Sequence, residues 1–94
     1  MSRSTHNTDY QLLLSVLKTA RKRVGVSQIE LAERLGNTQT FVSKCERGER
    51  RLDAVELVEF AEALGIQPQE LLGEYLDKRS VSPFAPIRKA RSRS

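Results

Sequence analysis

The sequence predicts an all-α fold of five helices. Apolar residues recur at three- and four-residue spacing in five stretches, and glycine or proline separates each stretch from the next. No stretch alternates with the two-residue period of a strand. Ninety-four residues suffice for one small domain, and an aromatic content of 5% means that aliphatic side chains must supply most of its core.

The first helix is expected to begin at Thr8 and to end near Gly25. Thr8 at the N-cap and Gln11 at N3 match the pattern of a capping box. Residues 1–7 are polar and are expected to be disordered. The predicted apolar side of this helix consists of Tyr10, Leu13, Leu14, Leu17, Ala20 and Val24.

Two short helices follow, separated by Gly36 and Asn37. Ser27 and Glu30 have the spacing of a second capping box, and Gly36 stands where a glycine ends a helix. Thr38 can cap the next helix, which ends near Gly48. The apolar positions are Ile29, Leu31, Ala32 and Leu35 in the first of these helices and Phe41, Val42 and Cys45 in the second.

The fourth helix is expected between Asp53 and Gly65, and Pro68 fits the first position of a fifth. The helical pattern stops after Leu76, which sets the predicted domain at residues 8–76. Residues 77–94 contain two prolines, six basic residues and one acidic residue. We therefore expect a flexible basic C-terminal tail, which either contacts phosphates or aids solubility.

The spacing around Gly36 is that of a helix-turn-helix unit over residues 28–47. Ala32 is small where the two helices must pass closely, and Gly36 tolerates the positive φ of the turn. Leu31, Leu35, Val42 and Cys45 stand at positions that can be buried together. One such match is weak evidence, but all of them together between two capped helices are specific.

These residues carry a resemblance to a known family. "VSQIELAERLGNTQTFVSKCERGERRLDAVELVEFAEALGIQPQELL" resembles the Cro/lambda-repressor-type, or Xre-type, helix-turn-helix proteins. The resemblance covers about Leu14 to Leu76 and implies a lambda-repressor-like five-helix domain with helix three in the DNA major groove. Asn37 and Cys45 depart from the usual apolar residues of the family, which predicts a looser turn and a small void.

The resemblance also implies roles for individual side chains. Gln28 corresponds to a phosphate ligand, and Arg21 with Glu46 corresponds to a buried ion pair between helices one and three. The expected base-reading residues on helix three are Thr38, Gln39, Thr40, Ser43 and Lys44. The expected phosphate contacts besides Gln28 are Arg47, Arg50, Arg51 and either Lys22 or Arg23.

Charge is distributed unevenly along the chain. Residues 52–76 carry six acidic residues and no basic one, although the whole chain has a net charge of +4. This asymmetry predicts an acidic side turned away from DNA. Leu72, Tyr75 and Leu76 are the candidates for a homodimer contact, since a two-fold dimer reads two half-sites.

Several classes of function are not indicated. One cysteine and one histidine cannot form a disulfide or a structural zinc site, and the sequence contains no phosphate-binding loop. No apolar run is long enough for a membrane span or a secretory signal, so a cytoplasmic protein is expected. Cys45 is interpreted as a small buried hydrophobe rather than a redox sensor.

The sequence therefore predicts a dimeric repressor that binds double-stranded DNA. Neither an enzymatic activity nor a cofactor, metal or small-molecule ligand is expected. The alternative is an antitoxin or adaptor that uses the same fold mainly for protein binding. The retained polar face of helix three, with Gln39 and Lys44, favours DNA.

Overall fold

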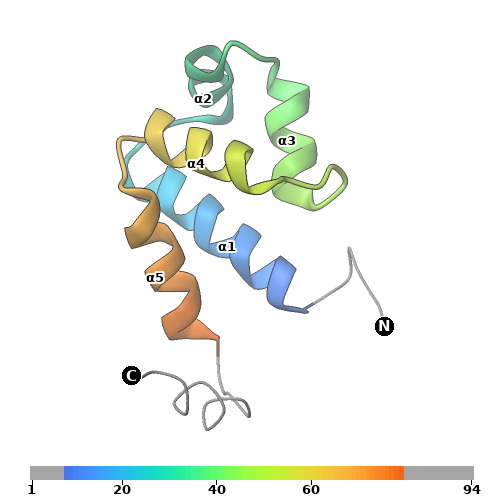
Figure 1. The fold of residues 1–94 in the computed structure, drawn as a ribbon. Helices are drawn as coiled ribbons and strands as arrows, with labels where there is room; N and C mark the ends of the chain where they lie inside the picture. Colours follow the sequence, from blue (N-terminus) through green and yellow to red (C-terminus); the bar gives the residue numbers. More distant parts are fainter. Residues whose placement is uncertain (1–7, 80–94) are drawn as a thin grey trace, which may run out of the picture.

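Five helices joined by short turns make up residues 8–79, the part of the chain that the computed structural model describes (Figure 1). No strand occurs in this range, so the prediction of an all-α, five-helix fold is confirmed. The expectations for residues 1–7 and for residues 80–94 of the tail lie outside the described residues. The helices are α1 (Thr8–Arg23), α2 (Gln28–Leu35), α3 (Gln39–Arg47), α4 (Ala54–Ala63) and α5 (Pro68–Lys78).

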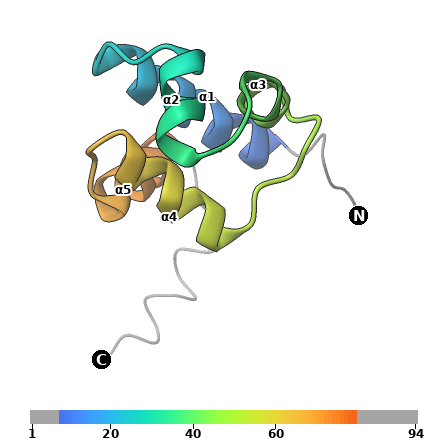
Figure 2. The same cartoon turned by 90° about the horizontal axis from the view of Figure 1, so that it is seen from above.

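Helix α1 lies at the centre of the arrangement. It packs against α3 on one side and α5 on the other, while α4 packs against α2 and α5 (Figures 1 and 2). Helices α2 and α3 contact one another and form the helix-turn-helix unit. The unit therefore rests on a support of three helices, and α3 has no comparable contact with α5.

Helix ends follow the local sequence closely. Ser27 Oγ accepts a hydrogen bond from the Glu30 N–H at 3.0 Å, and the Glu30 side chain accepts from the Ser27 N–H at 3.3 Å. This reciprocal pair is the predicted capping box, and Asp53 with Glu56 forms a second one at α4. Thr38 caps α3 as expected, by accepting from the main-chain N–H of the third residue into the helix.

Two helix boundaries and part of the core differ from the prediction. Helix α1 begins at Thr8 itself, which places this residue in the first turn and not at the N-cap. Val24 is 42% exposed, whereas Val16, which lies off the predicted stripe, is 2% exposed. Because α1 is covered by both α3 and α5, its buried side is wider than one apolar stripe. At the other end, α5 continues past Leu76 to Lys78.

The core is mainly aliphatic, as the low aromatic content requires. Its largest fully buried side chains are Phe60, Leu17, Leu31, Leu71, Val42 and Cys45. The Phe60 ring meets the partly buried ring of Phe41 at a centroid distance of 6.1 Å, which joins α3 to α4. Burial raises the pKa of the Cys45 thiol, so this side chain remains a neutral member of the core at physiological pH.

The turn between α2 and α3 is held by several hydrogen bonds. Gly36 has a φ of 68°, a left-handed conformation that glycine adopts without a steric cost. The Asn37 N–H donates to Ala32 O at 2.9 Å, and Asn37 Oδ1 accepts from the Thr38 N–H at 2.8 Å. The departure from an apolar residue at Asn37 thus adds a hydrogen bond to the turn.

A buried ion pair connects α1 to the C-terminal half of α3. Arg21 Nε lies 2.6 Å from Glu46 Oε2, and the two side chains are 8% and 2% exposed. A second bond joins Arg21 Nη2 to Glu46 Oε1 at 3.1 Å, and Arg21 Nη1 donates to Val26 O at 2.9 Å. The guanidinium therefore holds both α3 and the chain just before α2 against α1.

Removing one partner of this pair should strongly destabilise the protein. Arg21→Met leaves the Glu46 carboxylate buried without its cation, which is expected to lower the free energy of unfolding by about 3–5 kcal/mol. Arg23→Met is the matched control, because the Arg23–Glu74 pair is 3.4 Å long and half exposed. Its expected cost is about 0–1 kcal/mol. Urea unfolding of both variants measures the difference, and equal losses would contradict a structural role for Arg21.

Candidate nucleic-acid interface

Helix α3 divides into a buried side and a polar outer side. Its buried residues are Val42, Cys45 and Glu46, which face the other helices. The five predicted base-reading residues lie together on the other side. Thr38, Gln39, Thr40 and Lys44 are exposed, and Ser43 is partly buried. The structure therefore brings the whole predicted set to one surface.

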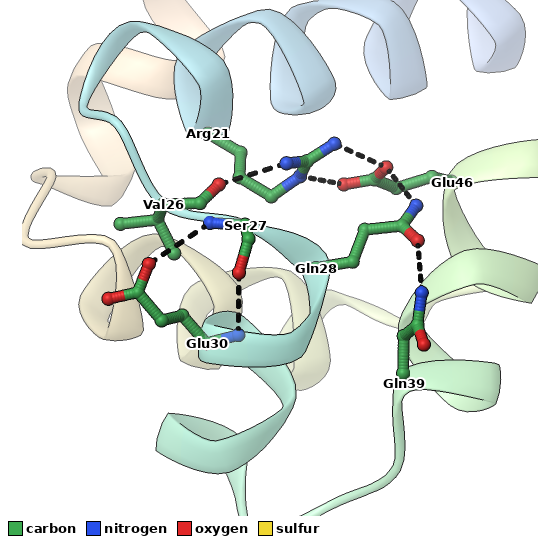
Figure 3. Close-up of polar contacts among 7 residues, drawn as sticks. All are labelled: Arg21, Val26, Ser27, Gln28, Glu30, Gln39 and Glu46. Carbon is green, nitrogen blue, oxygen red and sulfur yellow. Dashed lines mark hydrogen bonds and ion pairs between the residues drawn. The ribbon is translucent and has the colours of Figure 1, made fainter.

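A chain of hydrogen bonds links this surface to the buried ion pair (Figure 3). Gln28 Nε2 donates to Glu46 Oε1 at 2.9 Å, and Gln28 Oε1 accepts from Gln39 Nε2 at 3.2 Å. The chain thus runs from Arg21 through Glu46 and Gln28 to the first residue of α3. The sequence patterns did not predict the Glu46–Gln28 and Gln28–Gln39 contacts, since 18 and 11 positions separate their partners.

The N-terminal end of α2 lies beside the same surface. The capping box uses the main-chain N–H groups of Ser27 and Glu30. The capping box does not use the main-chain N–H groups of Gln28 and Ile29. Like the other N–H groups of the first turn of a helix, these two have no acceptor within the helix. Such donors, together with the positive end of the helix dipole, favour an anion at this position.

The arginines at the end of α3 and in the loop after it are engaged within the protein. Arg47 Nε lies 2.9 Å from Glu49 Oε2, and this contact lowers the pKa of Glu49. Arg47 also donates to the Ser43 hydroxyl. Arg50 pairs with Glu56, and the Arg51 guanidinium lies 4.1 Å from the centre of the Tyr10 ring. All three arginines are exposed, and Arg51 is the one that pairs with no carboxylate among residues 8–79.

Lys22 and Arg23, the two alternatives at the end of α1, differ in their surroundings. Arg23 pairs with Glu74 of α5, and the two residues line a hollow between α1 and α5. Lys22 is exposed and makes no ion pair with a described residue. Of the two, Lys22 has the cation that is free to bind a phosphate.

The predicted dimer residues lie on α5. Leu72 is 41% exposed and Leu76 is 58% exposed, while Tyr75 is partly buried and packs against the core. Leu72 and Leu76 are four residues apart, so they share one side of the helix. Exposed apolar side chains also occur on α4, where Val55 is 67% exposed.

Other kinds of site were sought in the same range. Between residues 8 and 79, no group of three or more His, Cys, Asp or Glu side chains is placed to hold a metal ion. No helix of that range is both long and apolar enough to cross a membrane.

Known proteins of similar sequence and structure agree with this architecture. A helix-turn-helix family model matches residues 17–71. An uncharacterised HTH-type transcriptional regulator, y4dJ of Sinorhizobium fredii, is 38% identical over 52 residues, which cover 55% of this chain and 68% of that protein.

Solved structures extend the match to the whole fold. An XRE-family-like protein from Pseudomonas syringae superposes with a TM-score of 0.74 at 45% identity, covering 80% of this chain and 92% of that one. The restriction-modification controller protein C.AhdI from Aeromonas hydrophila gives a TM-score of 0.63 at 34% identity, covering 69% and 98%. The chain belongs to the Xre, or Cro/lambda-repressor-type, helix-turn-helix family of DNA-binding transcriptional regulators.

Proposed function

We propose that this protein acts in the cytoplasm as a sequence-specific transcriptional repressor, a dimer that reads a pseudo-palindromic operator with α3 in the major groove. The observation that carries the proposal is the hydrogen-bonded chain from Glu46 through Gln28 to Gln39. It orients an exposed amide at the N-terminal end of α3, the end that approaches base edges in this mode of docking.

The direction of each amide follows from the chemistry of its neighbour. A carboxylate paired with a guanidinium only accepts hydrogen bonds, so Gln28 must turn its Nε2 toward Glu46. Its Oε1 then faces Gln39, which must turn its own Nε2 inward. Gln39 keeps its Oε1 and a second N–H for a ligand. These groups complement the N6 donor and N7 acceptor of adenine.

The remaining outer residues of α3 complete the base-reading surface. Lys44 is exposed and can donate to the O6 and N7 acceptors of guanine. The Thr40 methyl group can contact a thymine methyl, and the hydroxyls of Thr38 and Ser43 can bond to a base or to the backbone. We assign these residues to base readout as one contiguous surface.

The phosphate contacts surround this surface. Gln28 and the adjacent main-chain N–H groups at the start of α2 bind one phosphate, and Arg51 and Lys22 bind others. Arg47 can join them only by giving up its two-pronged pair with the exposed Glu49. Arg23 is a poorer candidate because its guanidinium is paired with Glu74. Arg50 belongs to the set predicted from the sequence, but its guanidinium is already paired with Glu56.

A second copy of the chain would pair through α5. Leu72 and Leu76 offer an apolar strip that association would remove from water, with Tyr75 behind it. Two copies related by a two-fold axis place their α3 helices in successive turns of the major groove. One copy contacts only one half-site, so recognition of a whole operator requires the dimer.

Selection of bound sequences from a random pool of duplex DNA tests the function directly. We expect an enriched motif with inverted half-sites whose centres lie about 34–36 Å apart. Affinity for the motif should fall steeply with salt, since phosphate contacts release counterions. No enriched motif, or binding that ignores salt, would favour the adaptor or antitoxin function instead.

Gln39→Ala should relax the choice of base at one position of each half-site. The loss on the selected sequence is expected to be about 1–3 kcal/mol, with a much smaller loss on random DNA. Gln69→Ala, which removes an exposed glutamine from α5, serves as the control and should leave both affinities unchanged. Equal weakening on both DNAs by Gln39→Ala would remove Gln39 from the base-reading set.

Leu76→Glu should give a monomer by placing a charge in the proposed α5 contact. Sedimentation should show the monomer mass, and apparent affinity for the full operator should fall on the order of 10²-fold or more. Leu76→Met, of similar volume, should remain dimeric. Val55→Glu tests the other exposed apolar site, on α4. If Val55→Glu alone abolishes the dimer, the interface lies on α4 and not on α5.

A further inference from the structure

Arg50 is the most heavily engaged side chain of the loop between α3 and α4. Its Nη1 donates to Glu56 Oε1 at 3.0 Å and its Nη2 to Glu56 Oε2 at 2.8 Å, which makes a two-pronged ion pair. Nη1 also donates to the main-chain oxygen of Arg51 at 3.0 Å. The guanidinium therefore binds the loop to itself and to the first turn of α4.

The same guanidinium also contacts α3. It lies 4.8 Å from the centre of the Phe41 ring, within the range of a cation–π contact. Burial raises the pKa of the nearby Cys45 thiol, and the positive charge of Arg50 partly offsets that rise. Arg50 thus joins the inner side of the base-reading helix to the start of α4.

Glu56 holds the other half of this contact and is itself fixed. Its Oε1 accepts from the Asp53 N–H at 3.1 Å, and its own N–H donates to Asp53 Oδ1 at 2.7 Å. The hydrogen bond from Arg50 lowers the pKa of Glu56, which keeps the carboxylate charged at neutral pH. A carboxylate in this position would repel a phosphate that approached Arg50.

A second attachment fixes the loop from the side of α1. The Leu52 N–H donates to the Tyr10 hydroxyl at 2.9 Å, and the Arg51 guanidinium lies over the ring of Tyr10. Two adjacent loop residues therefore contact different helices: Arg50 pairs with Glu56 of α4, and Arg51 lies over Tyr10 of α1. The Arg51 side chain nevertheless remains exposed.

We infer that Arg50 is a positioning residue, and that its pairing with Glu56 fixes the α3–α4 loop so that Arg51 and α3 meet the DNA together. The inference rests on the proposed DNA-binding function and assigns Arg50 a role other than that of a phosphate ligand. The guanidinium already makes three hydrogen bonds to Glu56 and to the main-chain oxygen of Arg51, and the Glu56 carboxylate neutralises its charge, so it attracts a phosphate less than an unpaired arginine would.

The two roles predict opposite results for Glu56→Gln. If Arg50 binds a phosphate, removing the carboxylate frees it, so DNA binding tightens and its salt dependence steepens. If Arg50 positions the loop, the loss of the ion pair weakens binding to the selected operator by about 2- to 30-fold. Glu59→Gln is the matched control, because Glu59 is an exposed carboxylate of α4 without a partner among residues 8–79. It should leave the operator affinity unchanged or slightly tighter.

Arg50→Lys separates the roles a second time with a milder change. Lysine keeps the positive charge and can bind a phosphate, but it lacks the two-pronged geometry that pairs with Glu56. Positioning predicts weaker operator binding with a salt slope changed by much less than the roughly 0.9 of one phosphate contact. An operator affinity equal to that of the wild type would overturn the inference.

The measurements use the full chain, and wild-type binding to the selected operator comes first. If the wild type binds no DNA, the proposed function fails before any variant is compared. If it binds and Glu56→Gln tightens the complex, only the role of Arg50 fails. Thermal unfolding of each variant shows whether it is folded before its DNA binding is compared. If Glu56→Gln does not fold, the Arg50→Lys variant is the one that tests the inference.

Discussion

The buried ion pair between Arg21 and Glu46 is the interaction on which the rest of the structure depends. It fastens α3 to α1 at a point where both side chains are almost completely removed from water. Because the carboxylate can only accept hydrogen bonds, it also determines how Gln28 and then Gln39 are turned. One charge pair in the interior thus sets the direction of an amide at the surface. The cost of burying two charges is offset only if every donor and acceptor is matched, and here the chain of bonds matches them.

The second constraint is the attachment of the loop that follows α3. Arg50 and Arg51 are adjacent, but the first pairs with Glu56 on α4 and the second lies over Tyr10 on α1. Without such contacts a loop of this kind would sample many conformations, at an entropic cost to any ligand that required only one. The protein thus orders the loop before DNA arrives. The positive charges of Arg50 and Arg51 thus take part in holding the loop to the helices on either side of it.

Capping patterns and helical periodicity predicted most of the fold. They missed features that depend on contacts between helices. The capping pairs Ser27–Glu30 and Asp53–Glu56 and the turn glycine Gly36 involve residues close in sequence, so their patterns are readable directly. The predicted apolar side of α1 included Val24, which is exposed, and left out Val16, which is buried. The buried side of α1 depends on two partner helices, α3 and α5, which the local pattern does not reveal. The five outer residues of α3 were found from the spacing of the unit and from family resemblance. Their hydrogen bonds were not, since the partners come from other helices.

Local sequence patterns specified the helices, their order, the helix-turn-helix spacing and the set of polar residues on α3. These features depend on three- and four-residue periodicity and on capping, which act over a single turn of helix. Only the packing of the helices decided that Arg23 pairs with Glu74, that Arg50 pairs with Glu56 and that Lys22 makes no ion pair with a described residue. It also decided the direction of the Gln39 amide. The type of a residue fixes its charge and its hydrogen-bonding groups. Which partner they meet depends on how helices that are distant in the chain pack together.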